Sequence, residues 1–251
     1  MDNMLRFIEK PHLPQGAVRN IIICEKYQKF LEKSLIEHNL TPIWLKNNDF
    51  VDERLSGHCD LMAAHLGGKT VVTSEFLNDS HIFGNLCVEQ LTIQNPTDKL
   101  YPMDAGLNFC IVGDKLIYNP KTACESAVSL LKCEKIPCKQ GYTKCSICVV
   151  DENSIITADS KIAQSAAAHG IDALLVDKRL SALDGFDYGF IGGASFKIGK
   201  NKLAFTGNIN NVTERERIES FLNKRGIEAV YLTSNGLFDI GSAIPLTEEA
   251  N

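Results

Sequence analysis

The sequence predicts an α/β propeller built from five strand-strand-helix-strand units. Two repeated patterns and their spacing support this prediction. One is an amphipathic helix followed by a short β-type run, and the other is a pair of apolar runs joined by a polar or glycine-containing turn. The hairpins start at intervals of about 40 to 50 residues, a period typical of propellers. Five units fill the 251 residues, which we expect to form a single domain, 1–251.

The helix-to-strand pattern occurs in three clear copies and one weaker copy. In each clear copy, Asn39, Gly170 or Gly226 stands where a helix can end in a left-handed residue. A β-type run follows directly. The segments are LEKSLIEHNLTPIWL (31–45), IAQSAAAHGIDALLV (162–176), IESFLNKRGIEAVYL (218–232) and, more weakly, PKTACESAVSLLKCEKIPCKQG (120–141).

Hairpin patterns lie between these units. Four are clear: CDLMAAHLGGKTVVTS, LNFCIVGDKLIYNP, CSICVVDENSIITAD and ASFKIGKNKLAFTGN, and SNGLFDIGSAIPL is expected to supply a fifth. An open doubly wound sheet is the main alternative. Repeated hairpins and the absence of a glycine-rich phosphate loop count against it. The hairpin starts are His58, Asp104, Cys145, Gly193 and Asp239.

Composition excludes several classes of partner. The formal charge of −5 and the pI near 5.7 offer no basic surface for nucleic acid. No apolar run approaches the roughly 20 residues of a membrane span, and MDNMLRFIEK lacks the apolar centre of a signal peptide. We therefore expect a cytoplasmic protein that binds neither nucleic acid nor membrane. Its nine cysteines lie mostly in apolar runs, which indicates buried thiols rather than disulfides.

Two segments resemble the pentein family of guanidino-group-modifying enzymes, which includes arginine deiminase, agmatine deiminase and dimethylarginine dimethylaminohydrolase. YGFIGGASFKIGKNKLAFTG, from Tyr188, is similar to a blade in which Gly-Gly precedes a strand, a turn and a second strand, and GSAIPL is similar to the closing segment. Among penteins the chain looks most like an uncharacterised bacterial group. The resemblance implies a five-bladed, pseudo-fivefold fold, a small cationic guanidino ligand, and deiminase-, amidinohydrolase- or amidinotransferase-like chemistry with no cofactor.

The chain departs from the pentein pattern at two positions. The family's glutamate before Gly-Gly, which binds the guanidinium, corresponds here to Ile191. The family's nucleophilic cysteine in the closing segment corresponds to Gly241, and no cysteine follows Cys148. The usual pentein site is therefore absent.

The catalytic residues could instead lie on other blades, because in this fold each blade presents its hairpin start to one central channel. HCD, His58 to Asp60, has the family's His-x-Asp form and supplies a general acid/base, while Cys145 supplies a nucleophile. Asp104 and Asp239 are the candidate carboxylates for binding a cationic substrate.

Simpler interpretations stay open for these residues. We expect His58 and Asp60 to lie two apart on a strand and so share a face, which a mutually hydrogen-bonded strand end would also explain. The simpler interpretation of Cys145 is a buried strand cysteine, because many other cysteines of this chain lie in apolar strand-like runs.

A zinc site is the competing reading of the cysteines. Cys133, Cys138, Cys145 and Cys148 could supply four thiolates. However, the last two precede a run that reads as strand, and a strand places residues three apart on opposite faces. We therefore expect no metal site.

Two classes of function follow. The first is a cysteine-dependent hydrolase of a small cationic guanidino compound. The second is a non-enzymatic pentein that binds a small ligand or a protein, as the ribosome anti-association factors of this fold do. The sequence is compatible with a homo-oligomer in either case.

Overall fold

The computed structural model describes residues 4–78 and 82–250. Within these residues the strands form five three-stranded sheets and one two-stranded sheet. Each three-stranded sheet has the same pairing: its central strand is antiparallel to one neighbour and parallel to the other. The sheets are β16 (Ile244–Pro245), β2 (Asn20–Cys24) and β3 (Thr41–Leu45); β4 (Ala63–Gly67), β5 (Thr70–Ser74) and β6 (Glu89–Ile93); β7 (Cys110–Val112), β8 (Lys115–Tyr118) and β9 (Glu134–Pro137); β10 (Ile147–Asp151), β11 (Ser154–Thr157) and β12 (Asp172–Leu175); and β13 (Ser195–Gly199), β14 (Lys202–Phe205) and β15 (Glu228–Tyr231).

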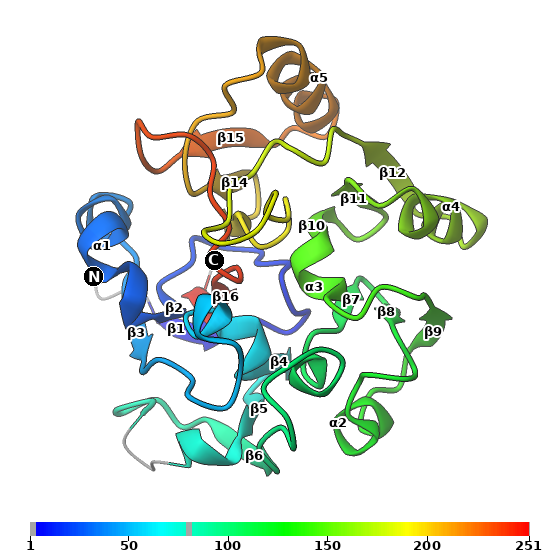
Figure 1. The fold of residues 1–251 in the computed structure, drawn as a ribbon. Helices are drawn as coiled ribbons and strands as arrows, with labels where there is room; N and C mark the ends of the chain where they lie inside the picture. The colour runs from blue at the N-terminus through cyan, green and yellow to red at the C-terminus, as the bar shows by residue number, and fades with distance from the viewer. Residues whose placement is uncertain (1–3, 79–81, 251) are drawn as a thin grey trace.

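The sheets lie around a common centre, with four helices on the outside (Figure 1). Each of these helices connects the two parallel strands of a sheet. They are α1 (Gln28–Glu37), α2 (Glu125–Ser129), α4 (Ser160–Ala168) and α5 (Val212–Asn223). The architecture is a mixed α/β fold of several small sheets, none of which closes into a barrel in the described part of the chain. An open doubly wound sheet, the alternative considered from the sequence, is excluded.

The helix-to-strand units predicted from the sequence are confirmed. Asn39, Gly170 and Gly226 have φ of 59°, 76° and 66°, so each adopts the left-handed conformation expected after a helix. The strand that follows returns beside the strand that preceded the helix, because a parallel pair needs such a crossover connection.

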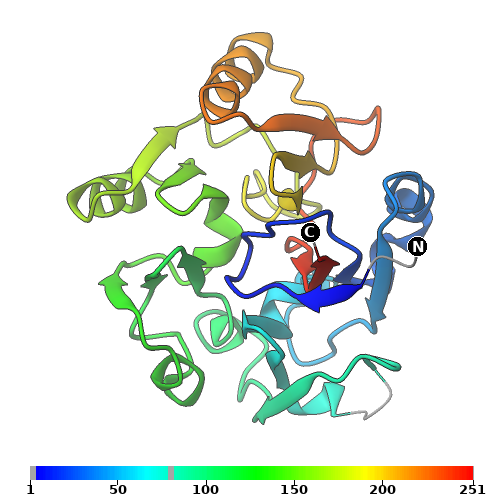
Figure 2. The ribbon, with the colours of Figure 1, turned by 180° about the vertical axis from the view of Figure 1, so that it is seen from behind.

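The prediction of a fifth local hairpin in SNGLFDIGSAIPL is wrong. Within this stretch only β16, two residues long, becomes a strand, and its partner is β2 near the other end of the chain. Two more terminal strands, β1 (Leu5–Phe7) and β17 (Thr247–Glu249), pair antiparallel. The pair formed by β1 and β17 lies near the centre of the back face (Figure 2).

The largest apolar cluster joins α1 to the sheet that the two termini complete. Leu31 and Leu35 of α1 pack with Ile21, Ile23 and Leu246, all nearly inaccessible. Burial of these side chains anchors the terminal strands. None of the helices within residues 4–78 and 82–250 has the length and hydropathy needed to cross a bilayer.

Candidate functional site

The predicted hairpin starts His58, Asp104, Cys145 and Gly193 each precede the first strand of a sheet, and Asp239 precedes β16. Backbone hydrogen bonds join several neighbouring starts: Gly193 N donates to Cys145 O (2.8 Å), and Asp60 N donates to Gly241 O (3.3 Å). Ser242 N also donates to Gly193 O (2.8 Å). Segments that precede different sheets are therefore hydrogen-bonded to one another.

His58 and Asp60 do not lie on a strand, contrary to the prediction. His58 has an extended backbone (φ −82°, ψ 100°) and immediately precedes a 3-10 turn, η3 (Cys59–Leu61), which contains Asp60. Strand alternation therefore does not explain how the two side chains are placed. The turn does, because it directs both toward the thiol of Cys145, while the Cys59 thiol donates to Ser242 O (3.2 Å).

Cys145 lies in a short helix, α3 (Thr143–Ser146), rather than on a strand. This placement corrects the strand interpretation. Asn108 holds the cysteine at both ends: Asn108 Oδ1 accepts from Cys145 N (3.2 Å), and Asn108 Nδ2 donates to Cys145 Sγ (3.3 Å). The sequence analysis missed Asn108, since an Asn before a strand is common in turns.

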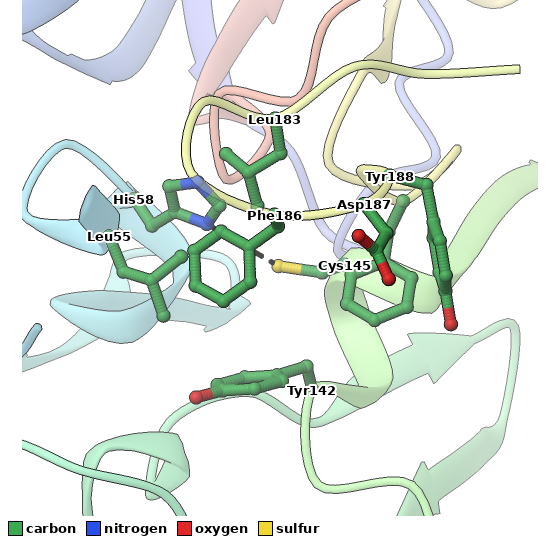
Figure 3. Close-up of a pocket in the computed structure, with 9 residues that line it drawn as sticks. Leu55, His58, Tyr142, Cys145, Leu183, Phe186, Asp187 and Tyr188 are labelled. Atoms are coloured by element: carbon green, nitrogen blue, oxygen red, sulfur yellow. Dashed lines mark hydrogen bonds between the residues drawn. The ribbon is translucent and has the colours of Figure 1, made fainter. Parts of the chain in front are cut away.

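The thiol of Cys145 contacts both members of the predicted His-x-Asp pair. Cys145 Sγ donates to Asp60 Oδ2 (2.8 Å), and it lies 3.9 Å from His58 Nδ1 (Figure 3). All three side chains are at least 98% buried. Asp60 Oδ1 and His58 Nε2 are buried without a hydrogen-bond partner. Such atoms are costly unless a ligand or water satisfies them, so this cluster has unused capacity to bind.

Burial controls the charge of this cluster. It raises the pKa of the Cys145 thiol well above the ordinary value, and the Asp60 and Asp239 carboxylates raise it further. Burial also raises the pKa of Asp60, to about 6, although His58 and Lys144 act in the opposite direction. At neutral pH the resting pair is therefore a neutral thiol donating to a carboxylate.

Asp239 lies on the other side of His58. Its Oδ1 accepts from Gly241 N (2.9 Å), and its Oδ2 accepts from Phe190 N (2.8 Å). Asp239 Oδ1 is also 3.9 Å from His58 Nε2, so the imidazole lies between a carboxylate and the thiol. The backbone donors hold Asp239 in place and leave its charge available to the site.

His58 fills the space that a side chain at residue 241 would need. Gly241 has φ of +68°, and a Cβ built there would lie 2.4 Å from His58 Cβ. A cysteine at residue 241 is therefore incompatible with this position of the imidazole. Ile191, at the position of the family's glutamate, is 3% exposed and packs in an apolar cluster.

Two further charged groups surround the cluster. Lys144 is 5% exposed, and its Nζ donates to Ser242 Oγ (3.0 Å) and Gly192 O (3.3 Å). Asp104 does not contact Cys145: its Oδ2 accepts from Tyr142 OH (2.7 Å), and its Oδ1 is buried without a partner. Burial raises the pKa of Asp104. Asp104 therefore lies behind a tyrosine that lines the pocket.

A pocket of about 230 Å³ opens above Cys145 and His58. Tyr142 forms one wall, and the connection between β12 and β13 forms much of the rest (Figure 3). The sequence analysis did not assign this connection, although LDGFDYGF places three aromatic residues in a segment without strand or helix periodicity. Its lining residues are Leu183, Phe186, Asp187, Tyr188 and Phe190.

The structure also contains a group that could hold a metal, and it differs from the four-cysteine set. His58, Cys145 and Asp239 each offer one ligand atom within 4.8 Å of the others. However, different ring nitrogens of His58 face Cys145 and Asp239, which does not suit one ion. The four-cysteine set is dispersed: Cys133, Cys138 and Cys148 pack in three separate apolar clusters.

Solved structures similar to this one include an amidinotransferase, an agmatine deiminase and a dimethylarginine dimethylaminohydrolase. The inosamine-phosphate amidinotransferase from Streptomyces griseus shares 9% identity over 98% of each chain, with a TM-score of 0.55. The agmatine deiminase of C. jejuni shares 10% identity over 99% of this chain and 97% of its own, also at 0.55. DDAH from Pseudomonas aeruginosa shares 9% over 93% of this chain and 100% of its own, at 0.50. At such identities the likeness shows the fold, and the predicted resemblance to penteins is confirmed.

The chain belongs to the family described as "Family of unknown function (DUF6873)", whose profile matches residues 22–244. The match includes every predicted site residue. No protein of curated function matches the sequence.

Proposed function

We propose that this protein is a cysteine-dependent enzyme that hydrolyses a small cationic guanidino compound, with Cys145 as nucleophile and His58 as general acid and base. One observation carries the proposal: His58 and Cys145 line one pocket, and Asp60 accepts a hydrogen bond from the Cys145 thiol, although the cysteine lies 85 residues from Asp60 in the sequence. In this reading the five sheets are blades of a pseudo-fivefold propeller, and the nucleophile has moved from the closing blade to the blade of β10.

The charges of the site support a cationic substrate. Two buried carboxylates, Asp60 and Asp239, surround the thiol and imidazole, whereas Lys144 is the nearby buried ammonium. The excess negative charge is costly in a buried site and is offset when a cation enters. The unpartnered Asp60 Oδ1 is an acceptor for an N–H of a planar guanidinium.

The positive charge of the substrate also counteracts the raised pKa of the Cys145 thiol. A guanidinium beside Cys145 stabilises the thiolate, because an opposite charge within a few ångströms lowers a thiol's pKa. In this mechanism the thiol proton leaves as the substrate binds, with His58 Nδ1, 3.9 Å away, as its acceptor. Asn108 Nδ2 then donates to the sulfur anion.

The reaction has two steps. Cys145 Sγ forms a bond to the central guanidino carbon, one C–N bond breaks, and the departing nitrogen takes a proton from His58. Water, deprotonated by His58, then attacks the S-bound carbon and the C–S bond breaks. The products are an amine or ammonia and the corresponding urea or ureido compound, and the thiol regains its proton.

Labelling with 2-chloroacetamidine, a cationic alkylating reagent shaped like a guanidinium, tests this proposal. It is expected to modify Cys145 faster than the exposed Cys87, and His58→Ala is expected to slow the modification. Neutral iodoacetamide serves as the control and should favour Cys87, because the Cys145 thiol has a raised pKa and is buried. The sites are identified by peptide mass spectrometry.

A non-enzymatic binding protein is the second candidate. The neutral, buried thiol and the absence of the family's cysteine at Gly241 favour it. If 2-chloroacetamidine labels cysteines in the order of their exposure, or if His58→Ala leaves the Cys145 rate unchanged, the hydrolase proposal fails and this second candidate replaces it.

A further inference from the structure

The walls of the pocket above Cys145 are made almost entirely of apolar and aromatic groups. Tyr142 and Phe190 lie with ring centroids 6.4 Å apart, and Tyr188 meets Phe190 edge-to-face at 6.2 Å. Leu55 and Leu183 add aliphatic surface on the side of His58 (Figure 3). A ligand bound at Cys145 must therefore extend between these side chains. We call this part of the pocket, lined by Leu55, Tyr142, Leu183, Phe186, Asp187, Tyr188 and Phe190, the sleeve.

The charges at this sleeve are as informative as its apolar surface. Apart from His58, the acidic side chain that lines the pocket is that of Asp187. Among the described residues, no lysine or arginine lines this pocket. Two cations lie nearby but are not among the lining residues. They stack on aromatic rings: Arg54 Cζ lies 4.2 Å from the centroid of Phe186, and Lys178 Nζ lies 5.2 Å from that of Tyr188.

Arg54 is also occupied by other contacts. Its guanidinium binds the Asp52 carboxylate through two nitrogens and donates to Gly185 O (3.0 Å). This arrangement braces the connection that carries Phe186. It does not supply a free cation to a ligand inside the pocket.

From this lining we infer that the substrate's tail is apolar and carries no carboxylate, so that the compound is an alkyl- or arylalkyl-guanidine rather than an amino acid. A carboxylate in the sleeve would lose its hydration without gaining a cationic partner, and it would face Asp187. An aromatic or aliphatic tail instead gains contact with rings already arranged to receive it. The inference rests on the proposed function for the guanidino head and concerns the part of the ligand that the chemistry does not use.

Calorimetry with the Cys145→Ser protein tests the inference without turnover. The probes are 2-phenylethylguanidine, butylguanidine, agmatine and arginine. We expect 2-phenylethylguanidine to bind at least about tenfold more tightly than arginine, since even one or two apolar groups in a fitted pocket give such ratios. Butylguanidine should fall between them, and agmatine should bind more tightly than arginine. Arginine binding as tightly as 2-phenylethylguanidine would overturn the inference.

Variants of the sleeve provide a second test. Phe186 is 40% exposed, so Phe186→Ala removes aromatic surface with little demand on folding. It should weaken the binding of 2-phenylethylguanidine several-fold and leave the binding of unsubstituted guanidine unchanged. Asp184→Ala in the same connection is the matched control and should leave both affinities unchanged. Asp187→Lys places a cation at the sleeve and should reduce the ratio by which 2-phenylethylguanidine binds more tightly than arginine. Unchanged ratios in both Phe186→Ala and Asp187→Lys contradict the inference.

One further probe separates this inference from the proposed function. 2-Phenylethylamine has the same tail but no guanidino group. If it binds as tightly as 2-phenylethylguanidine and both bind more tightly than arginine, the inference of an apolar tail stands. The proposal that the ligand carries a guanidino group is then wrong. If guanidines bind and label competitively but arginine is preferred, the function stands and the inference fails.

Discussion

The absence of a side chain at Gly241 determines where the imidazole of His58 lies. Because residue 241 has no Cβ, the imidazole occupies the space that a cysteine would need, and Asp239 holds the Gly241 backbone N–H. A side chain at residue 241 and the imidazole in this position cannot coexist. The thiol of Cys145 lies 3.9 Å from Nδ1 of the same imidazole.

Gly241→Ala is therefore expected to destabilise the protein more than an alanine at a glycine with similar φ and open surroundings. Gly170, with φ of +76° and no atom within 4 Å of an added Cβ, is the matched control. Gly170→Ala should cost about 1–2 kcal/mol, the usual cost of a left-handed residue. Gly241→Ala should cost roughly 1–3 kcal/mol more, because the new methyl group overpacks against His58.

Urea unfolding of the two variants measures the difference. Equal losses of unfolding free energy in Gly241→Ala and Gly170→Ala would show that residue 241 tolerates a side chain and that the imidazole is not confined by it.

At the scale of elements, short turns position the reactive groups more than the strands do. His58 immediately precedes a 3-10 turn that contains Asp60, and Cys145 belongs to a four-residue helix; each precedes a sheet's first strand. Asn108, in the turn before β7, ties α3 to the neighbouring sheet, because its backbone O also accepts from Thr143 N (3.1 Å). The orientation of the thiol therefore depends on a contact between two sheets.

Asn108→Asp is expected to slow alkylation of Cys145. The substitution keeps the shape of the side chain but replaces an N–H donor to the sulfur with a carboxylate oxygen, which raises the thiol's pKa further. One pKa unit corresponds to about a tenfold loss of thiolate at neutral pH. The measurement is the rate of 2-chloroacetamidine labelling as a function of pH, whose midpoint should move upward.

Asn153→Asp, at the exposed turn between β10 and β11, is the control and should leave the profile unchanged. An unshifted midpoint in Asn108→Asp would mean that the amide supports α3 without influencing the thiolate.

For the whole molecule, the two chain ends close the ring of sheets. Glu248 of β17 is 2% exposed and binds the N-terminal segment: it accepts from Arg6 Nε (2.9 Å) and Gly16 N (2.8 Å), and also from Gln15 N. A buried carboxylate with several donors fixes this segment across the back face (Figure 2).

Glu248→Ala is expected to lower the free energy of unfolding substantially. Each buried backbone N–H left without an acceptor costs roughly 1–3 kcal/mol. Glu152→Ala is the matched control, because Glu152 also binds the N-terminal segment, through Lys10 (2.8 Å), but both side chains are about half exposed. That surface pair should contribute less than about 1 kcal/mol. Similar losses in the two variants, measured by thermal and urea unfolding, would contradict this account of ring closure.

The pattern of helices, turns and hairpins follows from local sequence. Periodicity of apolar residues and the left-handed positions Asn39, Gly170 and Gly226 predict the helix-to-strand units, because both depend on residues only a few positions apart. The spacing of the hairpin starts further predicts that side chains as distant as His58 and Cys145 share one centre, and the structure brings these two together. Local pattern does not predict that β16 pairs with β2, since that pairing joins segments near the two ends of the chain.

Tertiary structure alone decides the fine geometry of the site. His58 and Asp60 meet Cys145 through a 3-10 turn rather than a strand, and Asn108 and the aromatic connection between β12 and β13 join them from other sheets. These contacts arise from packing between units, where burial and close approach, such as that of Gly241 to His58, select one arrangement. Sequence determined which residue types were available at the centre of the ring; packing around that centre determined which atoms face one another, because no local pattern encodes the distance between two sheets.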